Sequence, residues 1–389
     1  MPIGEQIVRK KSVLLTFIKL NYVMIESHFT KIILCISLLT ACKQSETSQQ
    51  IIEPIPPTQQ IASTGNGGYT YAILGSTADV TTTTSGATIC AGGGTDYDAA
   101  MTWMLQQSGG GDVVIIRNAQ LNSTPSATFD AYNDYFKNQL GVSVNSVETI
   151  FLNAKNVAQN QEVINKVKAA ECLFFTGGDQ ATYYNFIEGT GLEDAINYLK
   201  NTKKVPVGGT SAGCAIQGKT LFTANNGTIT SDEALINPFN NKLTLQKDNF
   251  MDSPFLSNVI ADTHFNNPDR RGRLLAFMAR MNKDYGILPR GIGIDEQTVV
   301  CIQANGIAKI FGSGYVFFCE QYYDTAGSPE TCIAGTKLDW YRGKQAVRCH
   351  RIQGNATGSN TFNLASWTAG STGVFTQFYY VDKGLFSRN

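Results

Sequence analysis

From residue 69 onward, short apolar runs alternate with stretches that carry apolar residues at helical spacing. The clearest run is Asp112 to Arg117, whose Val-Val-Ile-Ile centre is continuous, as in strands buried on both faces of a parallel sheet. Helices are expected at 98–107, about 128–140, 160–170 and about 191–201, and strands at 71–74, 87–91, 147–152 and 172–176. This alternation predicts βαβ units in an α/β fold, with a mostly parallel central sheet covered by helices on both faces.

After about residue 290 the pattern contains strands only. They are expected at 298–303, 307–311, 314–320, 346–352 and 375–381. We interpret them as the far edge of the central sheet plus additional antiparallel strands at the C-terminal end.

The N-terminal region is typical of a targeting segment. Lys31 precedes an apolar run from Ile32 to Leu39, which is too short to span a bilayer but suits the core of a signal peptide. The run ends in Leu-Thr-Ala-Cys42, which resembles the lipobox of bacterial lipoproteins, so residues 1–42 are predicted to be a signal peptide and Cys42 the lipidated residue. The protein is then expected to be exported and anchored in a bacterial-type cell envelope, with membrane contact only through the lipid. A plain buried segment is the alternative.

Residues 43–68 are rich in Gln, Ser, Thr, Pro and Gly and predict a disordered tether, which leaves 69–389 as the folded domain. Export would allow cysteines of the β-rich end to pair in an oxidising compartment. The candidates are Cys301, Cys319, Cys332 and Cys349, and the pairing stays open.

Charge and composition exclude several functions. The formal net charge is zero and no Lys/Arg-rich run occurs, which argues against a nucleic-acid partner. Nine cysteines without a CxxC pair and only three histidines argue against a zinc site, so neither a metal nor a cofactor is predicted.

The stretch Gly209-Thr-Ser211-Ala-Gly213 follows a short β-leaning run and fits a nucleophile elbow, in which a serine sits on a sharp strand-to-helix turn. Glycines allow the backbone to pack closely around such a turn. The amide of Ala212 would then point at the oxyanion formed on an attacked carbonyl.

A serine at such a turn needs a base. His28 lies in the targeting segment, so His264 and His350 remain, and His264 is favoured because it follows the apolar run Leu256 to Ala261. The orienting carboxylate stays open among Glu296, Asp295 and Asp262. A cysteine mechanism is disfavoured, because Cys214 lies one helical turn beyond the elbow rather than on it.

Other loops add candidates. Gly92-Gly93-Gly94 is interpreted as a tight turn, because it lacks the features of a nucleotide-binding loop. Asp179 is placed to cap a following helix. Arg270 and Arg273 share a helix face and suggest a substrate carboxylate, against the alternative of a solvated basic face.

Four motifs occur in order in the chain: Phe174-Phe-Thr-Gly-Gly-Asp-Gln180, the elbow, Asp262-x-His264-Phe followed by Arg270 and Gly-Arg273-Leu, and Gly293-Ile-Asp-Glu296. Over residues 88–320 this resembles cyanophycinase and its relatives, serine peptidases that include aspartyl dipeptidase. The resemblance implies a three-layer α/β/α fold like that of the class I glutamine amidotransferases, which would make 69–389 a peptidase domain with a β-rich part at 321–389. It also implies Ser211 as nucleophile, His264 as base and Glu296 as its partner. Ala212 with Gly178 or Asp179 would form the oxyanion hole, and Gln180, Asp262, Arg270 and Arg273 would line the substrate pocket.

The resemblance further implies hydrolysis of β-Asp-Arg or similar aspartyl bonds, through an acyl-enzyme, in a substrate that carries carboxylates and guanidinium groups. The sequence departs from the family pattern at Pro268, where an arginine is expected, and at Thr263, where a glutamine is expected. An α-aspartyl or acidic dipeptidase and a catalytically inactive binding lipoprotein are therefore kept as alternatives, and a homodimer stays open.

Overall fold

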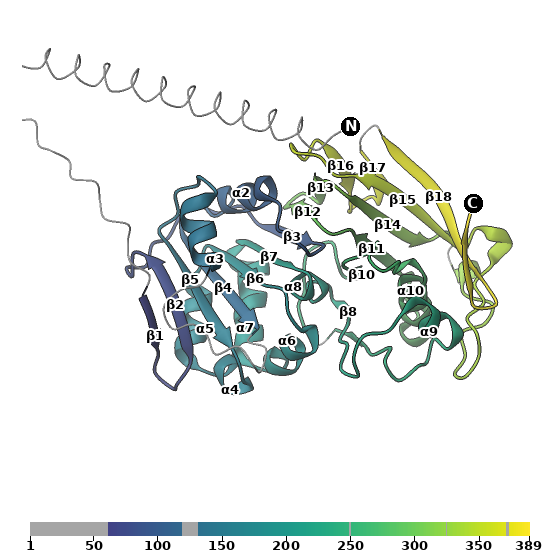
Figure 1. Ribbon diagram of the computed structural model, residues 1–389, viewed down its shortest axis with the longest axis horizontal. Helices are drawn as coiled ribbons and strands as arrows, with labels where there is room; N and C mark the ends of the chain where they lie inside the picture. Colours follow the sequence, from purple (N-terminus) through teal and green to yellow (C-terminus); the bar gives the residue numbers. More distant parts are fainter. Residues whose placement is uncertain (1–60, 119–130, 249, 324, 371–372) are drawn as a thin grey trace, which may run out of the picture. The chain divides into compact units, whose positions relative to one another are not determined.

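The computed structural model describes residues 61–118, 131–248, 250–323, 325–370 and 373–389 (Figure 1). The predicted signal peptide, Cys42 and the tether up to residue 60 lie outside these residues. Within the described ranges, every helix is too short or too polar to traverse a lipid bilayer.

The largest sheet contains eleven strands among the described residues. Their order is β1 (Ile61–Thr64), β2 (Thr70–Gly75), β5 (Ser146–Leu152), β4 (Asp112–Asn118), β6 (Cys172–Phe175), β7 (Pro206–Thr210), β3 (Ala87–Ala91), β12 (Thr298–Gln303), β13 (Ile307–Gly312), β16 (Asn360–Asn363) and β17 (Thr368–Ala369). The five strands from β5 to β3 are parallel, whereas the strands on either side join in antiparallel fashion.

Helices cover both faces of the parallel strands (Figure 1). One face packs against α2 (Asp98–Gln106), α3 (Ala131–Asp134) and the following π-helical turn (Tyr135–Gln139), and the other against α4 (Lys155–Ala158), α5 (Gln161–Ala169), α6 (Gln180–Ile187) and α7 (Gly191–Tyr198). Within β4, Val113 and Ile115 join the first core and Val114 and Ile116 the second, as the alternation of a strand requires. The predicted three-layer α/β/α architecture is confirmed.

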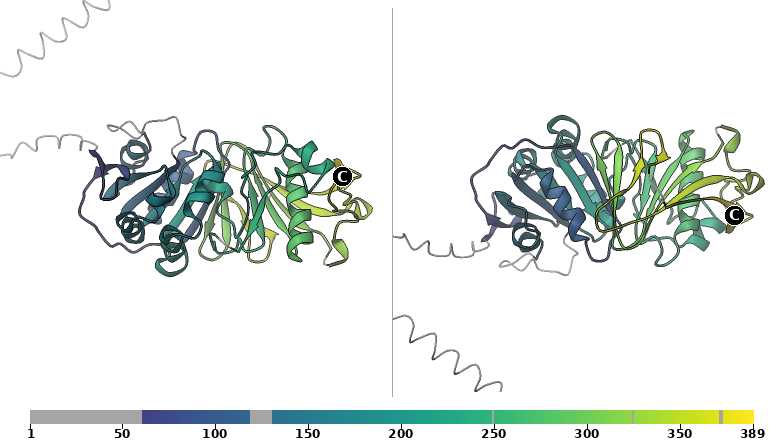
Figure 2. Two further views of the ribbon diagram at one scale, coloured as in Figure 1. Left: turned by 90° about the horizontal axis from the view of Figure 1, so that it is seen from below. Right: turned by 90° about the horizontal axis from the view of Figure 1, so that it is seen from above.

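The C-terminal strands do more than extend this sheet. Six strands form a second sheet, in the order β10 (Val259–Asp262), β11 (Arg290–Ile294), β14 (Tyr315–Gln321), β15 (Val347–Gln353), β18 (Val374–Asp382) and β19 (Leu385–Arg388). Within β14, Val316 and Phe318 face a core shared with the large sheet, while Phe317 and Cys319 face α9 (Ser231–Ile236) and α10 (Arg271–Tyr285). The two sheets therefore pack against each other through one apolar core (Figure 2). The sequence did not reveal this second sheet, because each of its strands reads like an ordinary edge addition.

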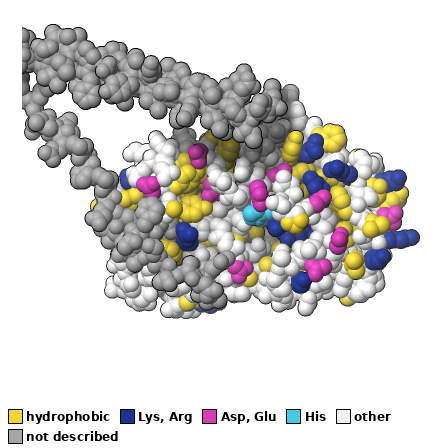
Figure 3. Space-filling view, viewed as in Figure 1, with side chains coloured by type: hydrophobic (Ala, Val, Ile, Leu, Met, Phe, Trp, Pro, Cys, Tyr) yellow, Lys and Arg dark blue, Asp and Glu magenta, His cyan; other side chains and the backbone are white. Residues whose placement is uncertain are grey.

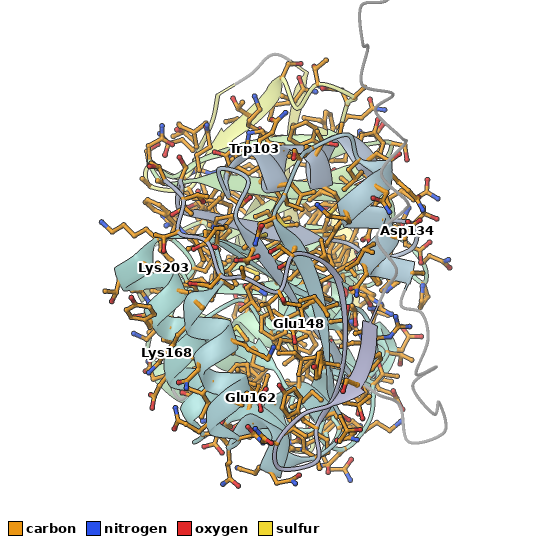
Figure 4. All side chains as sticks on the ribbon, turned by 90° about the vertical axis from the view of Figure 1, so that its left-hand side faces the viewer. Trp103, Asp134, Glu148, Glu162, Lys168 and Lys203 are labelled. Carbon is orange, nitrogen blue, oxygen red and sulfur yellow. The ribbon has the colours of Figure 1, made fainter. Side chains whose placement is uncertain are left out.

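The tether predicted for residues 43–68 is too long at its C-terminal end. β1 pairs with β2 as a hairpin, and the glycine-rich stretch Gly65 to Gly68 is its turn, with positive φ at Gly67 and Gly68. Glu162, at the start of α5 (Figure 4), fixes the hairpin because its carboxylate accepts from the Tyr69 hydroxyl at 2.8 Å and from the Asn66 amide at 3.1 Å. A composition typical of a linker here encodes a turn.

The seven cysteines of the described ranges are free thiols. Among the four considered for pairing, Cys319 and Cys349 lie opposite each other on β14 and β15, with their Sγ atoms 2.8 Å apart. Burial, followed by the neighbouring Cys349 thiol, raises the pKa of Cys319 well above its usual range.

Candidate active site

The carboxyl ends of five strands meet at one edge of the fold. In the large sheet, Thr210 of β7 is level with Ala91 of β3, and Phe175 of β6 is level with Gly209. In the second sheet, β10 and β11 run parallel and also end together. Loops at the carboxyl ends of parallel strands are where α/β proteins form their sites.

Ser211 occupies a strained turn between β7 and the short helix α8 (Ala212–Ala215). Its φ of 52° and ψ of −115° lie in a region that residues with a side chain seldom adopt. The neighbouring glycines make the turn possible: a Cβ on Gly209 would lie 2.4 Å from the backbone of Gly213, and one on Gly213 would lie 2.3 Å from the carbonyl oxygen of Phe175. The predicted elbow geometry is therefore present.

Ser211, His264 and Glu296 form a continuous hydrogen-bonded chain. Oγ of Ser211 lies 2.7 Å from Nε2 of His264, and Nδ1 of His264 lies 2.6 Å from Oε1 of Glu296. The histidine and glutamate side chains are 26% and 36% exposed, so the chain opens to solvent and to a substrate.

The other candidates for these positions are engaged elsewhere. Asp295 is buried and accepts from the Tyr315 amide at 3.0 Å, and burial raises the pKa of its carboxyl group. His350 lies on β15, where its Nδ1 is 2.8 Å from the Thr376 hydroxyl. Cys214 is fully buried in α8, and burial raises the pKa of its thiol well above the usual range.

The loop Gly92–Gly94, interpreted from the sequence as a tight turn, supports the segments that carry this hydrogen-bonded chain. The amide of His264 donates to the carbonyl oxygen of Gly92 at 2.8 Å, and that of Gln297 donates to Gly93 at 2.9 Å. The amide of Ser211 donates to Ala91, directly before the loop, at 3.0 Å. One short segment thus connects the elbow to the loops that carry the histidine and the glutamate.

Three backbone amides lie beside the serine without an acceptor among the described residues. Ala212 is the first residue of α8, where an amide has no partner within the helix. The amides of Gly178 and Asp179 belong to the loop between β6 and α6, and no hydrogen bond from them to the described part of the chain is present. Asp179 also caps α6, as predicted, by accepting from the Ala181 amide at 3.0 Å.

A cavity of about 300 Å³ opens beside Ser211 and His264. The predicted site residues that line it are Gly178, Asp179, Gln180, Ser211, His264, Arg270 and Arg273. Four further lining residues were not anticipated: Phe222, Ala224, Gly227 and Thr228. Phe222 ends the strand β8 (Thr220–Phe222), which pairs with β9 (Leu245–Lys247), and the other three residues belong to the irregular segment that follows β8. Nothing in the residue pattern of this region indicates a site.

The charged residues at the cavity differ in how many of their polar atoms are hydrogen-bonded. Arg273 donates to both oxygens of Asp262, at 2.8 and 2.5 Å, and both side chains are nearly fully buried. Arg270 donates from Nη1 to the Thr263 carbonyl oxygen at 2.7 Å and lies 3.9 Å from Asp262, while its buried Nε has no hydrogen-bond partner among the described residues. Burial and then the nearby Arg273 lower the pKa of Arg270. Among the described contacts, Arg270 is therefore the less fully hydrogen-bonded of the two arginines that line the cavity.

The surface around the site carries charges of both signs. On the face shown in Figure 3, histidine lies between acidic and basic side chains. The described residues contain no group of three or more His, Cys, Asp or Glu arranged to hold a metal ion.

A serine on a strained strand-to-helix turn, bonded to a histidine that is bonded in turn to a carboxylate, defines the class of α/β proteins with a serine-hydrolase site. Residues 84–310 match the model of peptidase family S51, and the chain belongs to this family of serine-type peptidases. The resemblance stated from the sequence motifs is thereby confirmed.

Several known proteins are similar to this chain. The cyanophycinase of Synechococcus elongatus is 26% identical over 217 residues, which cover 56% of this chain and 61% of that protein. The cyanophycinase of Geminocystis herdmanii is 25% identical over 209 residues, covering 54% and 70%. A crystal structure of a peptidase from an acI-B1 actinobacterium is 15% identical with a TM-score of 0.45, covering 72% of this chain and 98% of that one. The chain thus spans about three fifths of the length of the first of these relatives.

Proposed function

We propose that this chain is a serine peptidase that hydrolyses aspartyl peptide bonds, of the β-Asp-Arg type or similar, through a Ser211–His264–Glu296 triad. The observation that carries the proposal is the hydrogen-bonded chain from Oγ of Ser211 through His264 to Glu296, at 2.7 and 2.6 Å. Membership of family S51 supports the same chemistry.

The proposed reaction has two steps. With the imidazole proton on Nδ1 and donated to Glu296, Nε2 of His264 accepts the proton of Ser211 while Oγ attacks the amide carbonyl carbon. The oxyanion is held by the amides of Ala212 and of Gly178 or Asp179. His264 then gives its proton to the leaving amine as the C–N bond breaks, and water, deprotonated by the same histidine, releases the acyl group from the serine.

The proposed substrate carries a carboxylate next to the cleaved bond. Arg270 supports this choice, since it lines the cavity and, of its side-chain nitrogens, only Nη1 donates a hydrogen bond to the described part of the chain. Guanidinium groups bind carboxylates well. Gln180 is proposed to line the pocket from the opposite loop, although its Nε2 already donates to the Phe222 carbonyl oxygen at 2.5 Å. Asp262 and Arg273 are proposed to support the pocket wall rather than to bind substrate directly, because each engages the other.

A dipeptidase acting on α-aspartyl or other acidic dipeptides is the second candidate. It is favoured by the engagement of Asp262, which leaves this carboxylate without a free oxygen for the guanidinium group of an arginine-containing substrate. The departures at Thr263 and Pro268 fall in the same segment.

The test is to incubate residues 61–389 with β-aspartyl-arginine, β-aspartyl-leucine and α-aspartyl-leucine and to quantify the free amino acids. We expect at least one β-aspartyl dipeptide to be cleaved, and a Ser211→Ala variant to be folded and inactive. A folded wild-type protein that cleaves none of them and is not labelled by a fluorophosphonate would favour the third alternative, a binding lipoprotein. Cleavage that persists in the Ser211→Ala variant would refute the triad.

We also propose that the chain is exported and lipidated at Cys42. The support is the sequence alone, namely the apolar run Ile32 to Leu39 and the Leu-Thr-Ala-Cys motif. In a bacterial host given a radiolabelled fatty acid, the full chain should incorporate label and a Cys42→Ala variant should not. Equal incorporation by both would refute the assignment.

A further inference from the structure

We propose that Asn118 is a positioning residue that holds the Gly178–Asp179 loop so that its free amides face the reacting carbonyl. The inference rests on the proposed function, since it concerns the oxyanion donors of the same site. Sequence reasoning did not single out Asn118, which is the last residue of β4, the strand next to β6.

Asn118 contacts both residues of the loop. Its Nδ2 donates to the carbonyl oxygen of Asp179 at 2.5 Å. Its side chain also packs on Gly178: a Cβ at that glycine would lie 3.3 Å from Cβ and Cγ of Asn118. Gly178 has a φ of 140°, a conformation open essentially to glycine alone, so the loop needs external contacts to select it.

The Asp179 carbonyl oxygen that accepts from Asn118 also connects the loop to α6. The carbonyl of Asp179 also accepts the first backbone hydrogen bond of α6, from the Tyr183 amide at 3.3 Å. The Tyr183 hydroxyl in turn accepts from the backbone amide of Asn118 at 3.0 Å and lies 3.1 Å from the Thr176 carbonyl oxygen. Asn118 and Tyr183 thus brace the loop at both ends, from Thr176 to Asp179.

The orientation of the Asn118 amide is costly. Its Oδ1 is buried and has no hydrogen-bond partner within the described ranges of the chain, and a buried acceptor left unpaired destabilises a fold. Rotating the amide by 180° would instead turn Oδ1 against the Asp179 carbonyl oxygen, so only the observed orientation forms the bond. An unpaired group retained to keep one hydrogen bond points to a functional role for that bond.

The experiment replaces Asn118 with leucine, which removes the donor and keeps a side chain of similar size. We expect kcat on the dipeptide that the wild type cleaves to fall roughly 10- to 100-fold with KM changed less than about threefold, because the loss concerns the transition state. Affinity for aspartate β-semialdehyde, whose adduct with Ser211 carries an oxyanion, should fall in parallel with kcat. Affinity for the intact dipeptide, measured in the Ser211→Ala background, should not change.

Asn133 provides a matched control. It is also a buried asparagine whose Nδ2 donates to a backbone carbonyl, that of Ala72 at 2.7 Å, but it lies in α3, away from the loop. Asn133→Leu should lower the unfolding midpoint and leave kcat of the folded enzyme unchanged. If Asn118→Leu does not fold, Asn118→Ser, whose hydroxyl is too short to make the bond, takes its place with the same expectation.

The outcomes separate the two proposals. A folded variant at position 118 that retains kcat and semialdehyde affinity within twofold of wild type overturns the role of Asn118. The proposed function survives in that case, provided that Ser211→Ala is inactive. If the wild type cleaves no aspartyl dipeptide and is not labelled at Ser211, the proposed function fails and the role of Asn118 fails with it.

Discussion

The imidazole of His264 occupies the space in which a side chain at Gly93 would begin. A Cβ built on Gly93 would lie 2.4 Å from both Cε1 and Nε2 of the histidine, and the φ of Gly93 is 97°. Gly93 is therefore constrained in two ways: its backbone conformation favours glycine, and the imidazole of His264 leaves no space for a Cβ.

Gly93→Ala should accordingly displace the imidazole from Ser211. We expect kcat/KM to fall at least about 100-fold, since a shift of 1 Å at a catalytic group has an effect of this size. Steady-state kinetics on the cleaved dipeptide, with circular dichroism to verify folding, measures this. Gly141→Ala is the control, because Gly141 also has a positive φ (68°) but its Cβ would meet nothing within 4 Å. It should lose some stability and keep its activity, and a fully active Gly93→Ala would contradict the assigned contact.

The role of Gly93 illustrates what the sequence could not supply. Local patterns predicted the parallel strands and the elbow, because a buried strand such as Asp112–Asn118 is a continuous apolar run and a strained serine turn requires glycines next to it. The reason for the glycines at 92–94 lies in contacts with residues 264 and 297, far along the chain, and no local pattern encodes these contacts. The same holds for Thr228, which reaches the cavity only because β8, which pairs with β9, folds back against β10.

The carboxylate partner of His264 could be predicted from the sequence only in part. Spacing left Glu296, Asp295 and Asp262 open, and only their three-dimensional neighbours distinguish them: Asp295 is bonded to Tyr315 and Asp262 to Arg273. The β1–β2 hairpin could not be predicted for a different reason: the Gly65–Gly68 turn has the same composition as a flexible linker.

Glu296→Gln should keep the shape of the side chain but remove the negative charge that stabilises a protonated His264. We expect kcat to fall about 10²- to 10⁴-fold with little change in KM, because the charge acts in the transition state. Asp295→Asn is the comparison, since this neighbouring residue does not contact the histidine and should affect stability more than turnover. A Glu296→Gln enzyme within threefold of wild-type kcat would show that Glu296 has no catalytic role.

Arg273→Met should destabilise the fold by about 3–5 kcal/mol, because it leaves the carboxylate of Asp262 buried without its partner. Urea unfolding measures the loss. The double variant Arg273→Met/Asp262→Leu should recover a large part of it, since the buried carboxylate is removed together with its arginine partner. Lys155→Ala, which removes an exposed ion pair with Glu188 at 3.8 Å, should cost less than about 1 kcal/mol. Equal losses for Arg273→Met and Lys155→Ala would contradict the buried pair.

Lys200 predicts a pH dependence of stability. It is buried in the π-helical turn Leu199–Lys203, where Nζ donates to Gln217 at 2.7 Å, and burial lowers the pKa of this lysine from 10.5 to about 7. Between about pH 7 and 10.5 the unfolded chain binds this proton and the folded protein does not, so the free energy of unfolding should rise with pH by up to about 1.4 kcal/mol per unit. The gain is complete above pH 10.5 and is lost as the pH falls to about 7.

Lys200→Met removes the titrating group and keeps an unbranched apolar stem in its place. Urea unfolding at several pH values between about 7 and 9.5 should therefore show a smaller slope of stability against pH for this variant than for the wild type. Lys168→Met, at an exposed lysine of α5 (Figure 4), is the control and should retain the wild-type slope because it leaves Lys200 and its buried surroundings unchanged. Parallel curves for wild type and Lys200→Met would mean that Lys200 keeps its proton in the fold, and its environment would then have to supply more charge stabilisation than the single bond to Gln217 provides.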